Sequence, residues 1–283
     1  MRPTRRRVGL TIAILLLVTV LPVLPALPGL AVAGERVEFP SGALPADKSA
    51  DAPQMIAGFL HSPKKKGLLP AVVLLHGCSG VKLYHRKMAF RLAERGYAAL
   101  VVDSLGPRGF RSVCGSPSAV SPFTRAQDAY GALKYLRSLA FVDPERVGVI
   151  GWSHGGWTIM SVMQGDSDDP SIPSTLFTQD AKIRFKAAIA YYPWCPLGKK
   201  TFYGPLLILI GEADDWTPTR RCKVMVGKSQ AGGKPIRMKT YPGATHAFDA
   251  GVNRTVLGHR IASDPAARED ALIRVRDFLA ANL

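Results

Sequence analysis

One serine, one aspartate and one histidine in this chain have the types and the spacing needed for nucleophilic attack on a carbonyl carbon. Ser153 stands in the G-x-S-x-G segment GWSHG after the apolar run RVGVI, while Asp214 follows PLLILIG and His246 follows IRMKTYPG. A serine hydroxyl becomes a strong nucleophile when a histidine takes its proton, and that histidine needs a carboxylate to fix its tautomer and stabilise the imidazolium. The sequence therefore predicts a catalytic triad that acts through an acyl-enzyme.

The glycines around Ser153 have a physical reason. On a sharp turn between a strand and a helix, the serine is held in a strained backbone conformation, and glycines remove the side chains that would collide there. The segment WTIMSVM is compatible with the helix that should follow, whose N-terminus favours negative charge beside the serine oxygen. A G-x-S-x-G pattern also occurs by chance, so a turn serine without chemistry is the alternative. The placement of Asp214 and His246 after later strands argues against it.

Neighbouring residues compete for these roles. Asp215 adjoins Asp214, but the G-x-x-D-x-x-x-P frame from Gly211 to Pro218 favours Asp214. His154 adjoins the serine, and we expect its side chain to point away from the Ser153 hydroxyl. Three other histidines lack the strand-end context that His246 has, so we expect them to be surface or capping residues rather than the catalytic base: His61, His85 and His259.

Acyl transfer also needs an oxyanion hole, because negative charge develops on the carbonyl oxygen as the serine attacks. One donor should be the backbone N–H of His154, the residue after the nucleophile. The other should come from the loop after the third strand, where LLHGCSG supplies the backbone N–H of Cys78. In this role the Cys78 thiol is incidental.

These residues require a scaffold that brings distant segments together. Apolar runs of strand length alternate with helical patterns, and several runs, such as AVVLLHG, are apolar without alternation, which is typical of parallel strands covered on both faces. The pattern predicts a doubly wound α/β fold with a mostly parallel eight-stranded sheet and flanking helices. We expect strands near 36–39, 55–60, 71–76, 97–103, 146–150, 186–192, 205–211 and 236–241, and helices over 85–96, 124–139 and 264–283.

Residues 34–283 are predicted to form a single domain. Ligands of such sheets bind beyond the carboxyl ends of the strands. Two connecting segments, 103–121 and 164–180, are long enough to cover a site there. The last helix should begin with an Asp264 cap and Pro265 at its first position.

Residues 1–33 are predicted to be a signal peptide. The segment has a basic start, an apolar centre and an A-x-A site, which predicts cleavage after Ala33 and a periplasmic or secreted protein; the export route stays open. An uncleaved membrane anchor is the alternative. It is disfavoured because three prolines interrupt the apolar run before it reaches the roughly 20 residues of a spanning helix: Pro22, Pro25 and Pro28. We therefore expect no stable membrane insertion after cleavage.

The formal net charge of the chain is +16. Lys and Arg are spread along the sequence apart from the run Lys64–Lys66, and no nucleic-acid motif accompanies them. We interpret the charge as a solvated basic face and predict a small-molecule partner rather than nucleic acid. The oligomeric state stays open, and the sequence predicts no cofactor.

Four cysteines are too widely spaced for a metal site of the C-x-x-C type, so we expect no metal. An oxidising compartment would permit disulfides, and four thiols allow three complete pairings. We lean towards a Cys195–Cys222 pair, because both residues follow successive strands at what should be one edge of the sheet. Cys78 and Cys114 are the other two cysteines, and free thiols are also possible.

Six segments together resemble the dienelactone hydrolase-like branch of the α/β hydrolases over about residues 50–283: LLHGCSG, DSLGPRGFRSVCG, RAQDAYGALKYL, RVGVIGWSHGG, GEADDWTP and YPGATHAFD. The resemblance implies the α/β-hydrolase fold and matches Ser153, Asp214 and His246 to the family's triad positions. Dienelactone hydrolase itself has cysteine where this chain has Ser153. The departure supports ester hydrolysis more than lactone opening.

Arg108 and Arg111 follow the fourth strand in PRGFRSVCG and are candidate contacts for an acidic substrate. The equal alternative is that arginine ties this loop to neighbouring carbonyl groups.

The leading hypothesis for the whole chain is an exported serine hydrolase that cleaves a carboxylic ester or a lactone. A peptidase or acyltransferase with the same triad, or a non-catalytic binding module of the same fold, are the alternatives.

Overall fold

The computed structural model describes residues 34–42, 53–65, 67–164, 183–198, 200–229 and 236–283. Its strands are β1 (Glu35–Pro40), β2 (Met55–His61), β3 (Leu69–Leu75), β4 (Ala98–Asp103), β5 (Val142–Trp152), β6 (Ala187–Tyr191), β7 (Leu206–Gly211), β8 (Ile236–Tyr241), β9 (Arg254–Val256) and β10 (His259–Ile261). Its helices are α2 (Leu83–Glu94), α3 (Pro122–Ser138), α4 (His154–Val162), α5 (Thr219–Ser229) and α6 (Pro265–Asn282), with a short 3-10 helix, η1 (Gly106–Arg108).

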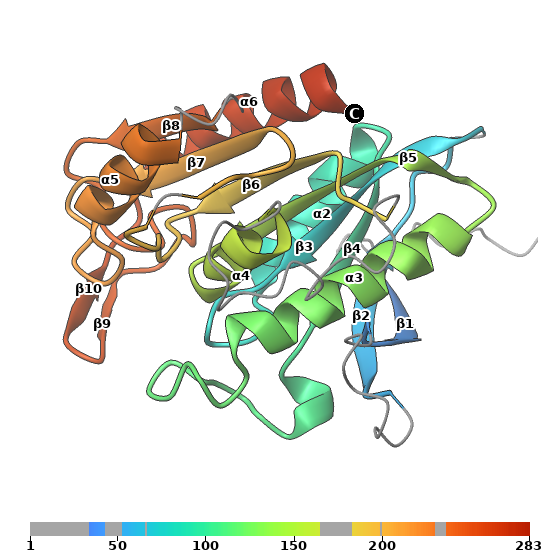
Figure 1. The fold of residues 1–283 in the computed structure, drawn as a ribbon, viewed down its shortest axis with the longest axis horizontal. Coiled ribbons are helices and arrows are strands. Elements are labelled where there is room, and N and C mark those ends of the chain that lie inside the picture. The colour runs from blue at the N-terminus through green and yellow to red at the C-terminus, as the bar shows by residue number, and fades with distance from the viewer. Residues whose placement is uncertain (1–33, 43–52, 66, 165–182, 199, 230–235) are drawn as a thin grey trace, which may run out of the picture.

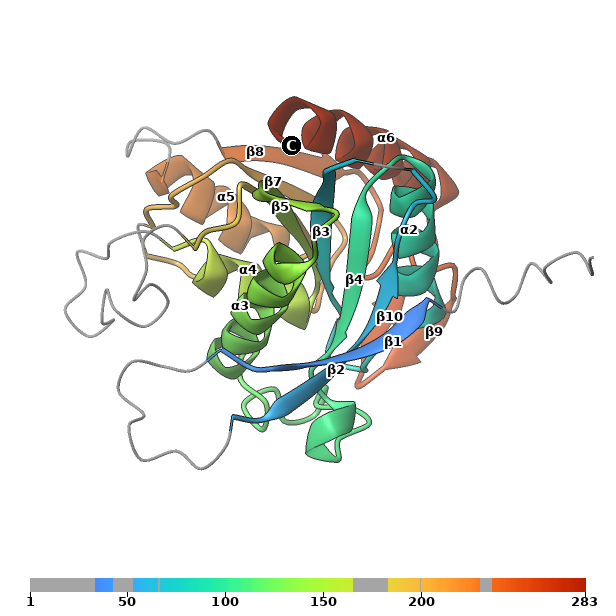
Figure 2. The ribbon, with the colours of Figure 1, turned by 90° about the vertical axis from the view of Figure 1, so that its right-hand side faces the viewer.

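A central eight-stranded sheet has the order β1-β2-β4-β3-β5-β6-β7-β8 (Figure 1). β2 pairs antiparallel with β1 and β4, and every other neighbouring pair of this sheet is parallel. Helices α2 and α6 cover one face, and α3, α4 and α5 cover the other (Figure 2). The predicted mostly parallel α/β sheet is confirmed, and its eight strands lie close to the predicted ranges.

The inner strands are apolar because both of their faces are covered. Every residue of β6 and β7 is buried, as are the last five residues of β3. Parallel strands between two helical layers need this continuous apolar pattern, which explains why it could be read from the sequence. Because β5, β6, β7 and β8 run parallel, the carboxyl ends of β5, β7 and β8 lie at one edge of the sheet, and the loops that follow them meet there.

Helix starts are fixed by local chemistry. The Asp264 side chain accepts a hydrogen bond from the backbone N–H of Ala267 at 2.9 Å, and Pro265 is the first residue of α6, as predicted. Ser121 caps α3 in the same way through the N–H of Thr124, at 3.1 Å. These caps satisfy backbone N–H groups that have no partner within the helix.

Two disulfides join segments that follow the strands of the sheet. Cys195–Cys222, the predicted pair, links the segment after β6 to α5. Cys78–Cys114 links the loop after β3 to the loop after β4. The second bond fixes part of the long 103–121 segment beside Ser153, since Cys78, Cys114 and Ser153 line one cavity.

Some of the structure differs from the expectations. Helix α5 and the β9–β10 hairpin were not predicted, and strands of three residues are too short to show a period. The expectation of a surface or capping residue is wrong for His61, which is buried. His85 is buried too, but it is a capping residue as expected, since its Nδ1 accepts the Lys82 N–H at the start of α2, at 2.9 Å. The predicted signal peptide, residues 1–33, and most of the 164–180 segment lie outside the described residues. Among the described helices, none combines the length and the apolar character that crossing a membrane requires.

Candidate active site

Ser153 lies on a strained turn between β5 and α4. Its backbone φ is 53° and its ψ is −112°, a conformation that L-residues rarely adopt. A Cβ atom at Gly151 would collide with the carbonyl group of Gly155, and one at Gly155 would collide with the carbonyl group of Leu75. The two glycines therefore allow the tight turn that places the serine hydroxyl in a cavity.

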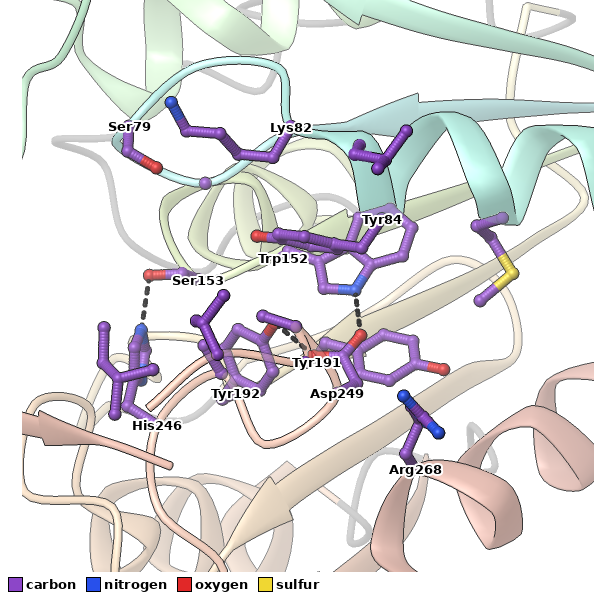
Figure 3. Close-up of a pocket in the computed structure, with 18 of the residues that line it drawn as sticks. Ser79, Lys82, Tyr84, Trp152, Ser153, Tyr191, Tyr192, His246, Asp249 and Arg268 are labelled. Carbon is purple, nitrogen blue, oxygen red and sulfur yellow. Dashed lines mark hydrogen bonds between the residues drawn. The ribbon is translucent and has the colours of Figure 1, made fainter. Parts of the chain in front are cut away.

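Ser153, His246 and Asp214 form a continuous hydrogen-bonded line. His246 Nε2 lies 2.9 Å from Ser153 Oγ (Figure 3), and His246 Nδ1 lies 2.8 Å from Asp214 Oδ2 on the other side of the ring. Because the carboxylate can only accept, Nδ1 carries the proton and Nε2 is free to accept the serine proton. The structure thus brings together the three residues that the sequence singled out.

The Asp214 carboxylate is fixed by its own turn. Oδ1 accepts hydrogen bonds from the backbone N–H groups of Trp216, at 3.0 Å, and Thr217, at 2.8 Å, and the side chain is fully buried. Asp215, in contrast, is exposed and pairs with His259 at 3.3 Å. The G-x-x-D-x-x-x-P frame therefore identified the aspartate that contacts His246.

Aromatic rings hold the His246 imidazole in place. Tyr192 meets it edge-on with 4.7 Å between ring centroids, and Trp216 lies at 5.1 Å. His246 is 3% exposed, so bulk water has little access to its hydrogen bonds. This packing restricts the ring to the orientation that reaches both Ser153 and Asp214.

The two residues predicted to supply the oxyanion donors, Cys78 and His154, belong to segments that adjoin Ser153. His154 is the first residue of α4, so its backbone N–H has no partner within the helix. Cys78 lines the same cavity as Ser153, and a Cβ atom on the preceding Gly77 would lie only 3.6 Å from Ser153 Cβ. The loop after β3 and the start of α4 therefore meet beside Ser153.

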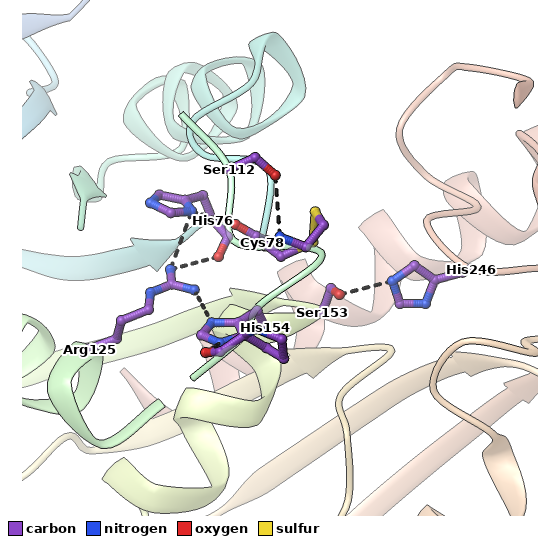
Figure 4. The surroundings of a disulfide bond; sticks show 10 residues. His76, Cys78, Ser112, Arg125, Ser153, His154 and His246 are labelled. Atoms are coloured by element: carbon purple, nitrogen blue, oxygen red, sulfur yellow. Dashed lines mark hydrogen bonds between the residues drawn. A yellow bond between two sulfur atoms is a disulfide. The ribbon is translucent and has the colours of Figure 1, made fainter. Parts of the chain in front are cut away.

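The His154 side chain points away from Ser153, as expected, and contacts a residue that sequence reasoning missed. Its Nδ1 lies 2.7 Å from Arg125 Nη1, and its Nε2 lies 3.0 Å from the carbonyl oxygen of Pro117 (Figure 4). Arg125 comes from α3 and is 0% exposed. It belongs to the segment RAQDAYGALKYL, where its charge alone would suggest a surface position.

The cavity in front of Ser153 has a volume of about 630 Å³. Figure 3 shows Ser153 and His246 at one end and Arg268 at the other. Aromatic and aliphatic side chains form much of its wall, and the charged residues among those that line it are Lys82, Lys87, Arg91, Arg254, Arg268 and Asp249. A small organic molecule fits such a space.

Asp249 is a second site residue that the sequence did not assign. Its Oδ1 accepts a hydrogen bond from the Tyr192 hydroxyl at 2.6 Å, and its Oδ2 accepts one from Trp152 Nε1 at 2.9 Å. Burial raises the pKa of this carboxyl group above its usual value, and the two hydrogen bonds oppose that rise. Its position three residues after His246 was a signal, although one that does not distinguish a site residue from a loop residue.

The structure places Arg108 and Arg111 outside the cavity lining. Arg108 donates to both oxygens of Asp128, each at 2.8 Å, and to the carbonyl oxygen of Ser104 at 2.7 Å. Arg111 is exposed. The Arg108 contacts correspond to the alternative in which arginine ties the loop down. The cationic residues of the cavity come instead from α2 and its N-cap Lys82, from β9 and from α6. In the part of the chain that the structure describes, no cluster of three His, Cys, Asp or Glu side chains is arranged to hold a metal ion.

Comparisons of this chain with known proteins point to one family. The model of the dienelactone hydrolase family matches residues 56–173 and 174–283. A protein of Bradyrhizobium sp. named as a probable 2-oxo-3-(5-oxofuran-2-ylidene)propanoate lactonase is 25% identical over 197 residues, which cover 67% of this chain and 77% of that protein.

Two solved structures have the same fold. The dienelactone hydrolase-like promiscuous phosphotriesterase P91 from metagenomic libraries superposes with a TM-score of 0.66 at 18% identity, covering 88% of this chain and 99% of the other. The thermophilic esterase Est2 of Thermogutta terrifontis with bound propionate gives a TM-score of 0.62 at 19% identity, covering 92% and 97% of the two chains.

Proposed function

Because this chain belongs to the dienelactone hydrolase family, whose members hydrolyse ester or lactone bonds, we propose that it is an exported serine hydrolase that cleaves a carboxylic ester through Ser153, His246 and Asp214. The observation that carries the proposal is the hydrogen-bonded line from Ser153 Oγ through His246 to the buried Asp214 carboxylate. It is the geometry that general-base activation of a serine requires.

In the proposed reaction, Ser153 Oγ attacks the ester carbonyl carbon while its proton moves to His246 Nε2. The Asp214 carboxylate stabilises the imidazolium that forms. The backbone N–H groups of Cys78 and His154 donate to the oxyanion of the tetrahedral intermediate. When the intermediate collapses, the alcohol leaves with the proton from His246, and the acyl group stays on Ser153. Water, deprotonated by His246, then attacks the acyl-enzyme and releases the acid.

The nucleophile supports an ester as the substrate. A serine nucleophile depends on its general base, and the 2.9 Å contact between Ser153 and His246 provides that base. Among the similar proteins, one is named a lactonase and another an esterase, so both kinds of acyl substrate fit the family. We place the ester first because the dienelactone-opening enzyme uses a cysteine at this position.

The charge of the cavity indicates the class of ester. Five of the charged residues that line it are cationic, and one, Asp249, is acidic. Coulomb attraction should therefore favour an ester that carries a carboxylate over its neutral methyl ester, and added salt should reduce the difference. Hydrolysis of such a matched pair at low and high salt tests this part of the proposal, and a lower KM for the neutral member would contradict it.

Labelling with a fluorophosphonate probe tests the nucleophile directly. The wild-type protein should be labelled on Ser153, and Ser153→Ala should abolish labelling. Asp214→Asn should reduce the rate by up to about 10⁴-fold, because the imidazole loses the partner that fixes its tautomer. Asp215→Asn is the matched control and should stay within a few-fold of the wild type, since its carboxylate faces His259. No labelling of the folded wild-type protein would overturn the proposal.

Export has separate support. Two disulfides within the described residues are typical of a protein that matures in an oxidising compartment. When the full chain is expressed in a bacterium, N-terminal sequencing of the mature protein should begin at Gly34. A protein that keeps Met1 and stays in the cytoplasm would contradict export without affecting the proposed chemistry.

A further inference from the structure

Arg125 is a fully buried cation behind the predicted oxyanion hole. Its Nη1 lies 2.7 Å from His154 Nδ1, and its Nη2 donates to the carbonyl oxygen of His76 at 2.7 Å (Figure 4). Burial lowers the pKa of Arg125 to about 10, so the guanidinium stays protonated at neutral pH. The nearby Asp128 carboxylate is bound by Arg108 and by the Ser41 hydroxyl, so in the described structure the hydrogen bonds of Arg125 run to an imidazole and a carbonyl group.

The two groups that Arg125 contacts belong to two different segments of the site. His76 is the residue directly after β3 and begins the turn that carries Cys78. His154 directly follows Ser153 at the start of α4. One rigid, planar guanidinium therefore bridges the two backbone segments whose N–H groups are the predicted oxyanion donors.

The protonation states of both histidines fit this bridge. Arg125 can only donate, so His154 Nδ1 must accept, and its Nε2–H donates to the Pro117 carbonyl oxygen. His76 Nε2 accepts the backbone N–H of Ser104 at 3.2 Å, so the proton is on Nδ1, which donates to the carbonyl oxygen of Gly77 at 2.6 Å. The 3.4 Å approach of Arg125 Nη2 to this Nδ1 then joins two donors, and Nη2 donates to the His76 carbonyl oxygen instead. Burial and the charge of Arg125 lower the pKa of both imidazoles, that of His154 to about 4. Both rings are thus neutral at pH 7, and the bridge is intact.

We propose that Arg125 is a positioning residue that sets the distance and orientation between the Cys78 and His154 N–H donors by holding His76 and His154 on one guanidinium. The inference rests on the proposed serine hydrolase function and concerns the same site. Arg125 contacts neither Ser153 nor His246 in the described structure, so it acts through the donors. Misplacing such donors weakens the stabilisation of the tetrahedral intermediate more than it weakens substrate binding.

A residue with a purely structural role would behave differently from a positioning residue. Its loss would lower the unfolding temperature without changing the rate of the chemical step in the protein that stays folded. Tyr130→Phe provides the matched control, because Tyr130 also lies buried on α3 and its hydroxyl ties α3 to the carbonyl oxygen of Val162 at the other end of α4, at 3.0 Å.

The test is the covalent labelling rate with a fluorophosphonate, whose phosphoryl oxygen occupies the oxyanion hole during attack. Arg125→Met should lower the maximal labelling rate and kcat by roughly 10- to 100-fold with KM little changed, and Tyr130→Phe should stay within about 2-fold of the wild type. Arg125→Lys should resemble Arg125→Met, because one ammonium group on a flexible stem does not replace the rigid fork that spans both acceptors.

The outcomes separate the two proposals. An unlabelled wild-type protein overturns the serine hydrolase function, and this inference with it. A labelled wild type together with a folded Arg125→Met variant that reacts at the wild-type rate overturns only the role of Arg125.

If Arg125→Met does not fold, the pair His154→Leu and His154→Asn replaces it in the test. Asn keeps an acceptor for Arg125 and should be labelled faster than Leu, which has none. Equal rates in the two variants overturn the inference.

Discussion

The Tyr192 hydroxyl donates a 2.6 Å hydrogen bond to Asp249 Oδ1, while the Tyr192 ring packs edge-on against the His246 imidazole. Tyr192 has a backbone φ of 35°, so this side chain is held in place by a strained turn after β6. One residue thereby connects a half-buried carboxylate in the cavity wall to the position of the predicted general base. The hydroxyl and the ring have separable tasks.

Substitutions at Tyr192 can separate these tasks. Tyr192→Phe keeps the ring against His246 and removes the donor to Asp249, so we expect a loss of about 1–3 kcal/mol in the free energy of unfolding with kcat nearly unchanged. Tyr192→Ala also removes the ring and should lower kcat, because His246 gains freedom to leave Ser153. Urea unfolding and ester hydrolysis measure the two effects. If Tyr192→Phe loses as much activity as Tyr192→Ala, the hydroxyl and Asp249 act in the reaction itself.

The two disulfides should differ in their effect on the site. Each closes a loop of the chain, across 36 residues for Cys78–Cys114 and 27 for Cys195–Cys222, so removal of either should cost about 3–4 kcal/mol of stability. Only Cys78–Cys114 anchors the loop that carries a predicted oxyanion donor.

The double variant Cys78→Ala/Cys114→Ala keeps the backbone N–H at position 78 but frees the loop, so its labelling rate should fall. Cys195→Ala/Cys222→Ala is the control of similar loop length and should keep the rate of the wild type. Both variants are compared at a temperature where each is folded by circular dichroism. Equal labelling rates for the two would show that the disulfide beside Ser153 contributes to stability alone.

The parts of this site that the sequence could predict depend on strand ends. Ser153 and Asp214 each follow a strand with a visible apolar run, His246 follows β8, in which apolar and polar residues are mixed, and a parallel sheet brings the carboxyl ends of these strands to one edge. Arg125 and Asp249 could not be predicted in this way. A charged residue on a helix is usually exposed, and burial of Arg125 depends on the long-range approach of His76 and His154, which no local pattern encodes. For the same reason the sequence could not decide between a substrate contact and a loop contact for Arg108, whose partner, Asp128, lies on α3.

Buried neutral histidines should make the protein sensitive to mild acid. Burial is the largest cause that lowers the pKa of His61 to about 4, of His154 to about 4 and of His85 to about 3. The unfolded chain takes up these protons near pH 6.5, before the folded chain does. The free energy of unfolding is therefore highest above pH 6.5 and decreases as the pH falls towards the lowered pKa values.

The variant His85→Gln removes one such group. Between pH 6 and pH 5 the free energy of unfolding of this variant should fall less steeply than that of the wild type, by up to about 1.4 kcal/mol per pH unit. Urea unfolding at both pH values measures the slopes, with His259→Gln as the control, because that side chain is partly exposed. Parallel slopes for the wild type and His85→Gln would mean that His85 takes up its proton equally in the folded and unfolded chains.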